Sequence, residues 1–163
     1  TQYVDHVDIA FDGCDEVDSH LNALKSGGGI HTQEKIIASM ADKYIVLVDE
    51  SKFHETLPFQ VPVVVEVLPK AFSIVKKKLE ELNGNVELRT AANKDGFLMS
   101  DEGNILLDVY FNDVQDIGLL NQTLLMMPGI VDTSLFVDIL TGFILVNDKG
   151  VFKKEKNGEF NAL

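Results

Sequence analysis

Hydrophobic residues in the first third of the chain come in runs rather than in strict alternation, which is typical of strands buried on both faces. Two such runs, at residues 3–11 and 44–48, predict two strands of a parallel sheet. Between them we expect a turn of helix near residues 19–24 and a longer helix with Thr32 as its N-cap. Strand, loop, helix and strand in this order predict an α/β domain with a parallel sheet covered on both faces.

From residue 60 onward the pattern changes to strand, helix, strand, strand, helix, strand, which is the order of a ferredoxin-like split unit. The two helices expected there end at Asn83-Gly84 and at Pro128-Gly129. The expected elements are strand 61–68, helix 70–82, strand 86–91, a hairpin of 97–100 with 104–111, helix 117–127 and strand 130–136. A last hairpin of 143–146 with 151–154 is predicted to precede a loose tail at 157–163.

The composition of the chain argues against several classes of function. The chain has 163 residues, of which 45% are hydrophobic and 25% charged, as in ordinary globular proteins. No apolar run approaches the ~20 residues of a membrane-spanning helix, and the first residues lack the pattern of a signal peptide. A net charge of −12 argues against nucleic acid, whose backbone needs a basic face, but not against a small anionic ligand. We therefore expect neither a membrane nor a nucleic-acid partner.

The cysteine and the histidines of the chain indicate neither an internal disulfide nor a metal site. Cys14 is the single cysteine, so no internal disulfide can form, and this is typical of a reducing cytoplasm. Cys14 is expected to pack as a small apolar side chain. The four histidines, at positions 6, 20, 31 and 54, do not share metal-ligand spacing. The sequence therefore predicts a cytoplasmic protein without a bound metal.

Most candidate chemistry lies between residues 7 and 35. Asp12 and Asp15 follow the first strand, Lys25 precedes a glycine-rich run at 26–29, and Glu34 falls in the first turn of the expected helix. Carboxylates at the end of a strand, a cation and bare backbone amides can together bind an anion and move protons. Taken singly, each has an ordinary structural explanation, such as a turn, a solvated face or a favourable helix dipole. In this order they indicate a stretch that moves a proton on a small phosphorylated sugar.

A series of motifs makes this interpretation more specific. They are DGCDEVD at 12–18, LKSGGG at 24–29, QEK at 33–35, DESK at 49–52, VEVLP at 65–69, DEGN at 101–104 and MPGIV at 127–131. In this order and spacing the chain resembles the type A ribose-5-phosphate isomerases across nearly its whole length. The resemblance implies a Rossmann-like parallel-sheet domain, incomplete at its N-terminus, with an inserted ferredoxin-like α+β domain. We expect the first domain at 1–59 and 132–163, and the second at 60–131.

The resemblance also implies an activity and a set of site residues. The reaction is the interconversion of D-ribose 5-phosphate and D-ribulose 5-phosphate through an enediol(ate), in the non-oxidative pentose phosphate pathway, without a cofactor or metal. Glu34 matches the proton acceptor, and Lys25 matches the cation beside the developing oxyanion. Asp12 and Asp15 match the acids that line the sugar, and one of them is expected to move the ring-hydroxyl proton. Family members associate, so a homodimer or homotetramer is expected.

The remaining expected substrate contacts surround those four residues. They are Gly13 and Cys14 beside the acids, the backbone of Ser26, Gly27 and Gly28, and the side chain of Lys52. The resemblance has departures: Ser26 and Ser134 stand where the family has glycine, Cys14 where it has alanine, and His31 where an apolar residue is common. The family's N-terminal phosphate loop and the strands before it have no counterpart, so we expect that a portion is missing and that this fragment is inactive alone.

Two other functions compete with the isomerase. A magnesium-dependent phosphotransfer enzyme would use Asp12, Asp15 and Asp18 as metal ligands, although Lys25 beside them disfavours a cation. A non-catalytic sugar-phosphate sensor would need no base, and Glu34 argues against it.

Overall fold

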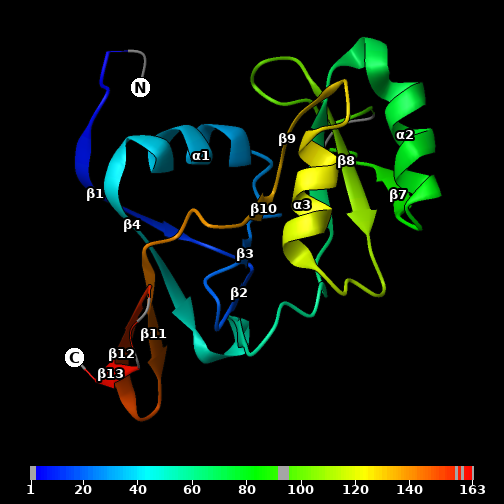
Figure 1. The fold of residues 1–163 in the computed structure, drawn as a ribbon. Coiled ribbons are helices and arrows are strands. Elements are labelled where there is room, and N and C mark those ends of the chain that lie inside the picture. Colours follow the sequence, from blue (N-terminus) through cyan, green and yellow to red (C-terminus); the bar gives the residue numbers. More distant parts are fainter. Residues whose placement is uncertain (1–2, 92–95, 157, 159, 163) are drawn as a thin grey trace. The chain divides into compact units, whose positions relative to one another are not determined.

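The computed structural model describes residues 3–91, 96–156, 158 and 160–162, and it divides into two compact units (Figure 1). The first unit contains Thr1–Lys25, Gln33–Pro58 and Phe136–Leu163. The second contains Ser26–Thr32 and Phe59–Leu135. The domain boundaries expected from the sequence stay a prediction, and each unit is described below by itself.

The first unit is built on a mixed sheet in the order β1-β4-β11-β12-β13. Its parallel part consists of β1 (Val7–Gly13), β4 (Ala41–Asp49) and β11 (Gly142–Asn147). The antiparallel part is the hairpin predicted near the C-terminus, β11 with β12 (Gly150–Glu155), extended by β13 (Asn161–Ala162). The prediction of a loose tail was wrong at 161–162, because these residues add a strand to the edge offered by β12. Helix α1 (His31–Met40) lies in the connection from β1 to β4.

A second, smaller sheet replaces the helical turn predicted at 19–24. Its order is β10-β3-β2-β5, with β2 (Glu16–Asp18), β3 (Ala23–Leu24), β5 (Phe53–His54) and β10 (Leu135–Phe136). The turn between β2 and β3 is held by Asp18, whose carboxylate accepts hydrogen bonds of 2.9 Å from the backbone N–H of His20 and of Asn22. A side chain that satisfies the backbone in this way offers an alternative to helix formation. The predicted helical turn is therefore wrong.

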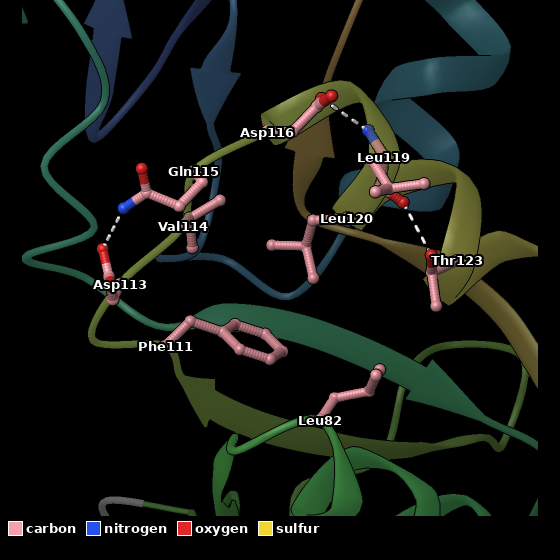
Figure 2. A pocket seen from close by; sticks show the side chains of 9 residues that line it. All are labelled: Leu82, Phe111, Asp113, Val114, Gln115, Asp116, Leu119, Leu120 and Thr123. Carbon is pink, nitrogen blue, oxygen red and sulfur yellow. Dashed lines mark hydrogen bonds between the residues drawn. The ribbon is translucent and has the colours of Figure 1, made fainter.

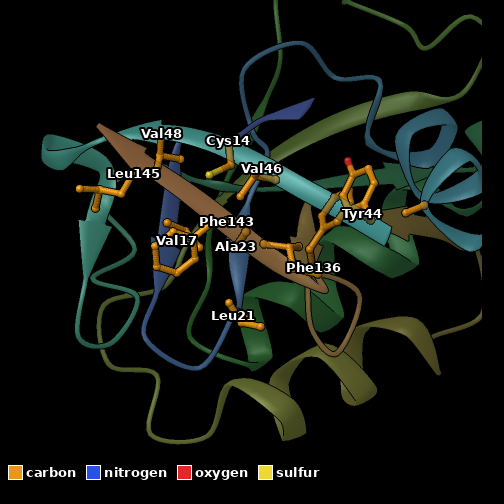
Figure 3. Close-up of a cluster of buried hydrophobic side chains, with 12 residues drawn as sticks. Cys14, Val17, Leu21, Ala23, Tyr44, Val46, Val48, Phe136, Phe143 and Leu145 are labelled. Atoms are coloured by element: carbon orange, nitrogen blue, oxygen red, sulfur yellow. The ribbon is translucent and has the colours of Figure 1, made fainter. Parts of the chain in front are cut away.

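The core of the first unit lies on one face of the mixed sheet (Figure 3). The buried side chains come from both sheets, from α1 and from the connecting loops, and they are Cys14, Val17, Leu21, Ala23, Ala38, Tyr44, Val46, Val48, Phe136, Leu140, Phe143 and Leu145. Tyr44 is stacked on Phe136, with ring centroids 6.1 Å apart. Cys14 packs into this core, in the manner expected for a small apolar side chain.

The second unit has the predicted ferredoxin-like order of elements. These are β6 (Val63–Val67), α2 (Phe72–Glu81), β7 (Asn85–Leu88), β8 (Ile105–Tyr110), α3 (Ile117–Leu125) and β9 (Ile130–Thr133). They form an antiparallel sheet in the order β7-β8-β6-β9. The α/β fold class predicted from the sequence is confirmed.

Several predicted boundaries shift for identifiable reasons. The strand expected at 130–136 is two strands in different sheets, because the chain turns at Ser134 between β9 and β10. The helix expected from residue 70 begins as a 3-10 turn (Pro69–Ala71) before α2. The helix ends at Glu81, and its end is capped by Asn83, whose φ of 61° is left-handed and whose N–H donates to Glu80 O at 3.0 Å, as in a Schellman cap. Thr32 is not an N-cap, since it lies inside α1.

In the hairpin expected from 97–100 with 104–111, the first segment is mostly irregular. There the described residues make isolated bridges, Thr90 with Phe97 and Met99 with Ile105, while β8 forms as a regular strand. None of the helices in the described part of the chain has the length and apolar character needed to cross a membrane.

Candidate active site

Lys25 is the centre of a charged cluster in the first unit. Its Nζ lies 3.0 Å from Asp12 Oδ1 and 3.1 Å from Glu34 Oε1, and it also donates to the carbonyl oxygen of Gly13. Only 5% of the Lys25 side chain is exposed. A buried ammonium is unfavourable unless it is paired, and here two carboxylates and a carbonyl surround it. The three residues that the sequence placed as base, acid and cation are thus in direct contact.

Asp12 is held at both carboxylate oxygens. It sits near the C-terminal end of β1, where Oδ1 accepts the N–H of Gly13 at 2.8 Å. The hydroxyl of Tyr44 donates to Oδ2 at 2.6 Å. Burial, and then the hydrogen bond to Asp12, raises the pKa of Tyr44 far above its ordinary value, so this hydroxyl keeps its proton and acts as a donor.

Glu34 lies in the first turn of α1 with 16% of its side chain exposed. Burial raises the pKa of Glu34, and Lys25 opposes this shift by favouring the charged form, while the negative charges of Asp12 and Asp15 add to it. A carboxyl with a raised pKa beside a cation has the character of a general base.

Cys14, Asp15 and Lys52 surround this cluster more loosely. Burial raises the pKa of the Cys14 thiol to about 12, against the influence of Lys25 and Lys52. The thiol is therefore protonated at physiological pH and is no candidate nucleophile. Asp15 acts electrostatically on both Cys14 and Glu34, and its backbone N–H donates to Leu24 O at 2.8 Å.

The glycine-rich run belongs to the second unit, where Arg89 fixes its carbonyl groups. One guanidinium nitrogen, Nη2, donates to Ser26 O at 2.8 Å, and Nη1 donates to Gly27 O at 3.3 Å. Asp108 anchors Arg89 through an ion pair of 2.6 Å. In a trans peptide the C=O and the following N–H point in opposite directions, so the amides of Gly27 and Gly28 are directed away from Arg89. An arginine distant in sequence thus sets the orientation of the expected amide cradle.

Glycine at position 29 is required by two constraints. Its φ is +68°, and a Cβ there would lie 2.7 Å from Leu106 Cδ1. The next residues, His31 and Thr32, open α1, and His31 is fully buried.

The two serines that stand in place of family glycines lie together within the second unit. Ser26 Oγ donates to Pro62 O at 2.5 Å and lies 3.4 Å from Ser134 Oγ, which in turn accepts the N–H of Val64 at 2.8 Å. Both serines are buried. The two serines therefore form one structural feature, in which the hydroxyl group of each has hydrogen-bond partners inside the protein.

Glu66 forms a buried polar network beside that feature. It accepts hydrogen bonds from Thr32, from Ser100 at 2.6 Å and from Asn104 Nδ2 at 2.8 Å. Burial alone would raise the pKa of Glu66, but the three hydrogen bonds outweigh it and lower the pKa. This carboxylate stays ionised and has a structural role in holding the start of α1.

The predicted site residues thus fall into three groups in the structure. Asp12, Lys25 and Glu34 are in contact, whereas Gly13 contributes a carbonyl and an N–H to them. Asp15, Cys14 and Lys52 are electrostatic neighbours in the same unit, and Ser26, Gly27 and Gly28 belong to the second unit. Sequence reasoning missed Tyr44 and Arg89. For Tyr44 a signal existed, because a tyrosine within a buried run must find a partner for its hydroxyl.

A pocket in the second unit contains none of these residues. It has a volume of about 290 Å³ and lies between the end of β8 and the start of α3 (Figure 2). Its lining residues are Leu82, Phe111, Asp113, Val114, Gln115, Asp116, Leu119, Leu120 and Thr123. Asp116 serves there as the N-cap of α3, accepting the N–H of Leu119 at 2.8 Å.

Among the described residues, the carboxylates of the acidic run are not arranged as metal ligands. Only His6, Asp8 and Asp42, all exposed, come within a metal-binding spacing in that part of the chain, and Asp8 lies toward the start of β1 whereas Asp12 lies toward its end. Asp18 is occupied as the turn residue between β2 and β3. The geometry therefore does not favour the magnesium site considered from the sequence.

Comparison with known proteins identifies relatives of this chain. Residues 1–150 match the family model described as ribose 5-phosphate isomerase A (phosphoriboisomerase A). The ribose-5-phosphate isomerase A of Thermosynechococcus vestitus is 45% identical over 136 residues, which cover 83% of this chain and 58% of that protein. The protein of the same name from Thermococcus kodakarensis is 42% identical over 153 residues, with 94% and 67% covered.

Solved structures of ribose 5-phosphate isomerases are also similar to this chain. Ribose 5-phosphate isomerase A from Methanocaldococcus jannaschii matches with a TM-score of 0.86 and 38% identity, covering 93% of this chain and 67% of that one. A D-ribose-5-phosphate isomerase in complex with phospho-erythronic acid matches with a TM-score of 0.89 and 39% identity, covering 94% and 67%.

The fold and the matched proteins define the class, an α/β protein related to the sugar-phosphate isomerases. Within that class, the chain belongs to the ribose 5-phosphate isomerase A family, which confirms the resemblance seen in its motifs. The chain spans 58% of the length of the Thermosynechococcus relative and 67% of the Thermococcus relative.

Proposed function

We propose that the protein carrying this chain interconverts D-ribose 5-phosphate and D-ribulose 5-phosphate by proton transfer between neighbouring carbons. The observation that carries the proposal is the Glu34–Lys25–Asp12 cluster, in which a carboxyl of raised pKa and a second carboxylate share one buried ammonium. Family membership supplies the substrate class, and a similar structure holds a phosphorylated sugar acid.

In this mechanism Asp12 and Glu34 act in succession. Ribose 5-phosphate is mostly a closed furanose, so a carboxylate must first move the C1 hydroxyl proton and open the ring. Glu34 then removes the proton from C2, and the C1 carbonyl becomes the oxyanion of an enediolate. The C2 hydroxyl proton passes to O1, so that O2 becomes the ketone oxygen, and Glu34 returns the proton it holds to C1. Because one carboxyl carries the proton both ways, no external acid or base is consumed.

Lys25 would stabilise the enediolate oxygen as negative charge develops there. A preorganised cation in a site shielded from water costs little reorganisation during the reaction. We propose that the amides of Gly27 and Gly28 add to this stabilisation, that Lys52 binds the substrate, and that Gly13, Cys14, Asp15 and Ser26 line the site.

The direct test is conversion of D-ribose 5-phosphate to the ketose, followed by absorbance or NMR, with and without a metal chelator. We expect conversion that survives the chelator, since no step above needs a metal. The assay uses the polypeptide that carries this chain, with its intact mass measured on the same sample. Binding of the sugar phosphate without any turnover would favour a sensor instead, and loss of turnover with the chelator would favour the phosphotransfer class.

The pH dependence should report the environment of Glu34. Burial raises its pKa, and a general base is active only when ionised, so activity is lost as the pH falls through that raised value. We therefore expect the acid limb of kcat/KM to lie above about 4.3, the ordinary pKa of a glutamic acid. A limb at or below the ordinary value would mean that Glu34 is not the base, or that substrate-free Glu34 is solvated.

We also propose a cytoplasmic homodimer or homotetramer, as the family resemblance implies. Light scattering of the purified protein, together with cell fractionation, measures both properties directly.

A further inference from the structure

Tyr44 connects the core of the first unit to the charged cluster. It is 1% exposed, and its ring is stacked on Phe136 with an interplanar angle of 14° (Figure 3). The register of the sheet pairs Ala10 with Tyr44 and Asp12 with Val46. Since alternate residues of a strand face the same way, Ala10, Asp12 and Tyr44 share one face of the sheet. The Tyr44 ring therefore passes the small Ala10 side chain and reaches the carboxylate two residues further along β1.

The hydrogen bonds of Asp12 show what this contact does. Oδ1 accepts the N–H of Gly13 and lies 3.0 Å from Lys25 Nζ, whereas Oδ2 accepts the hydroxyl of Tyr44 at 2.6 Å. An ionised carboxylate offers about four acceptor positions, two on each oxygen. Among the described contacts, the position that remains for a substrate hydroxyl is on Oδ2. Tyr44 thus sets the direction of Oδ2, the Asp12 oxygen that can accept a proton from the substrate hydroxyl.

The contact is also rigid. The aromatic stack fixes the Tyr44 ring, and a hydrogen bond to a charged group is stronger than one between neutral groups. Tyr44 remains a donor at physiological pH because burial raises the pKa of its hydroxyl. Without that hydroxyl the Asp12 carboxylate would keep both contacts on Oδ1 but would lose the one that sets the direction of Oδ2.

We propose that Tyr44 is a positioning residue for ring opening, which aims Asp12 Oδ2 at the C1 hydroxyl of the furanose. This inference rests on the proposed isomerase function. In the step concerned, Oδ2 accepts the C1 hydroxyl proton, the C1–O4 bond breaks with its electron pair on O4, and the electrons left on O1 form the C1 carbonyl. Asp12 then gives the proton to O4, so the step is balanced. Proton transfer between C1 and C2 belongs to Glu34 and does not require Tyr44.

The two steps can be separated with the ketose substrate. D-ribulose 5-phosphate carries its phosphate on O5 and cannot close to a furanose. Exchange of its C1 proton with D₂O therefore reports the enediolate step, whereas formation of ribose 5-phosphate also requires ring closure. NMR measures both rates in one sample of the polypeptide that carries this chain. The ratio of exchange to isomerisation is the quantity of interest.

For Tyr44→Phe we expect kcat of isomerisation to fall about 10- to 100-fold, as for loss of a hydrogen bond to a charged group, with KM little changed. The ratio of exchange to isomerisation should rise by a similar factor. Tyr110→Phe in β8 is the matched control and should match the wild type in both rates. The thermal midpoint of each variant checks that the stack with Phe136 is kept.

Each other outcome contradicts the inference. Normal isomerisation in Tyr44→Phe would show that its hydroxyl does not matter for Asp12. An unchanged ratio with both rates reduced would show that Tyr44 supports the whole site rather than ring opening. If the wild type itself neither isomerises nor exchanges, the proposed function fails, and that result is distinct from any failure at Tyr44.

Discussion

Replacing Glu34 by glutamine should reduce kcat for isomerisation by about 10⁴-fold, the upper end of the range for loss of a general base. The amide has nearly the same shape but cannot accept the C2 proton, and the second carboxylate that contacts Lys25 is Asp12. Because Gly13 and Tyr44 fix the orientation of the Asp12 carboxylate, with Oδ2 directed at the ring hydroxyl, we expect it not to substitute for Glu34 at C2. The measurement is steady-state turnover of D-ribose 5-phosphate at the pH optimum of the wild type.

Binding should separate this effect from misfolding. Glu34→Gln keeps a polar group beside Lys25 and removes a negative charge from a buried site, so the folded state should remain. We therefore expect calorimetric binding of the sugar phosphate to persist while turnover is lost. Glu50→Gln, an exposed substitution of the same kind, is the matched control and should leave turnover unchanged. Turnover within a few-fold of the wild type in Glu34→Gln would show that another group is the base.

Where the sequence predicted structure correctly, the determining interactions were local or periodic. Strand β4, the helices α2 and α3 and the order of elements along the second unit follow from hydrophobic periodicity and from breakers such as Pro128-Gly129. Strand β1 also forms, but it begins at Val7 rather than at residue 3, and none of its residues is buried, whereas the sequence predicted a strand buried on both faces. The prediction fails where hydrogen bonds from a side chain to the backbone favour a conformation other than the one that hydrophobic periodicity predicts. Asp18 turns the chain into β2 and β3 instead of a helix, through hydrogen bonds that apolar periodicity does not record.

For the site, sequence order identified the groups that carry charge but not those that orient them. Asp12, Lys25 and Glu34 lie within 22 residues of one another and share a motif series. Tyr44 contacts Asp12 from 32 residues away within the first unit, and Arg89 contacts the carbonyl of Ser26 from 63 residues away within the second. Such contacts depend on strand register and on packing within each unit, which one sequence does not specify. The reactive groups are therefore easier to predict than the contacts that hold them in place.

Replacing Lys25 by alanine is expected to lower kcat about 10²- to 10³-fold, the effect of removing one preorganised oxyanion donor. The reason is the position of Nζ between Asp12 and Glu34, where it favours negative charge on the substrate more in the enediolate than in the ground state. The predicted signature is a loss in kcat that exceeds any rise in KM. Lys43→Ala, which removes an exposed lysine from β4, controls for the change in net charge and should behave as the wild type.

Loss of this ammonium has a second consequence, and it distinguishes Lys25 from a simple binding residue. Lys25 lowers the pKa of Glu34 whereas burial raises it, so without the lysine the carboxyl should ionise only at higher pH. The acid limb of kcat/KM should therefore move upward in Lys25→Ala, and a small alkylammonium ion added to the assay should restore part of the activity and move the limb back. A rise in KM alone, with an unmoved acid limb and no response to the added amine, would mean that Lys25 only holds the ground-state substrate.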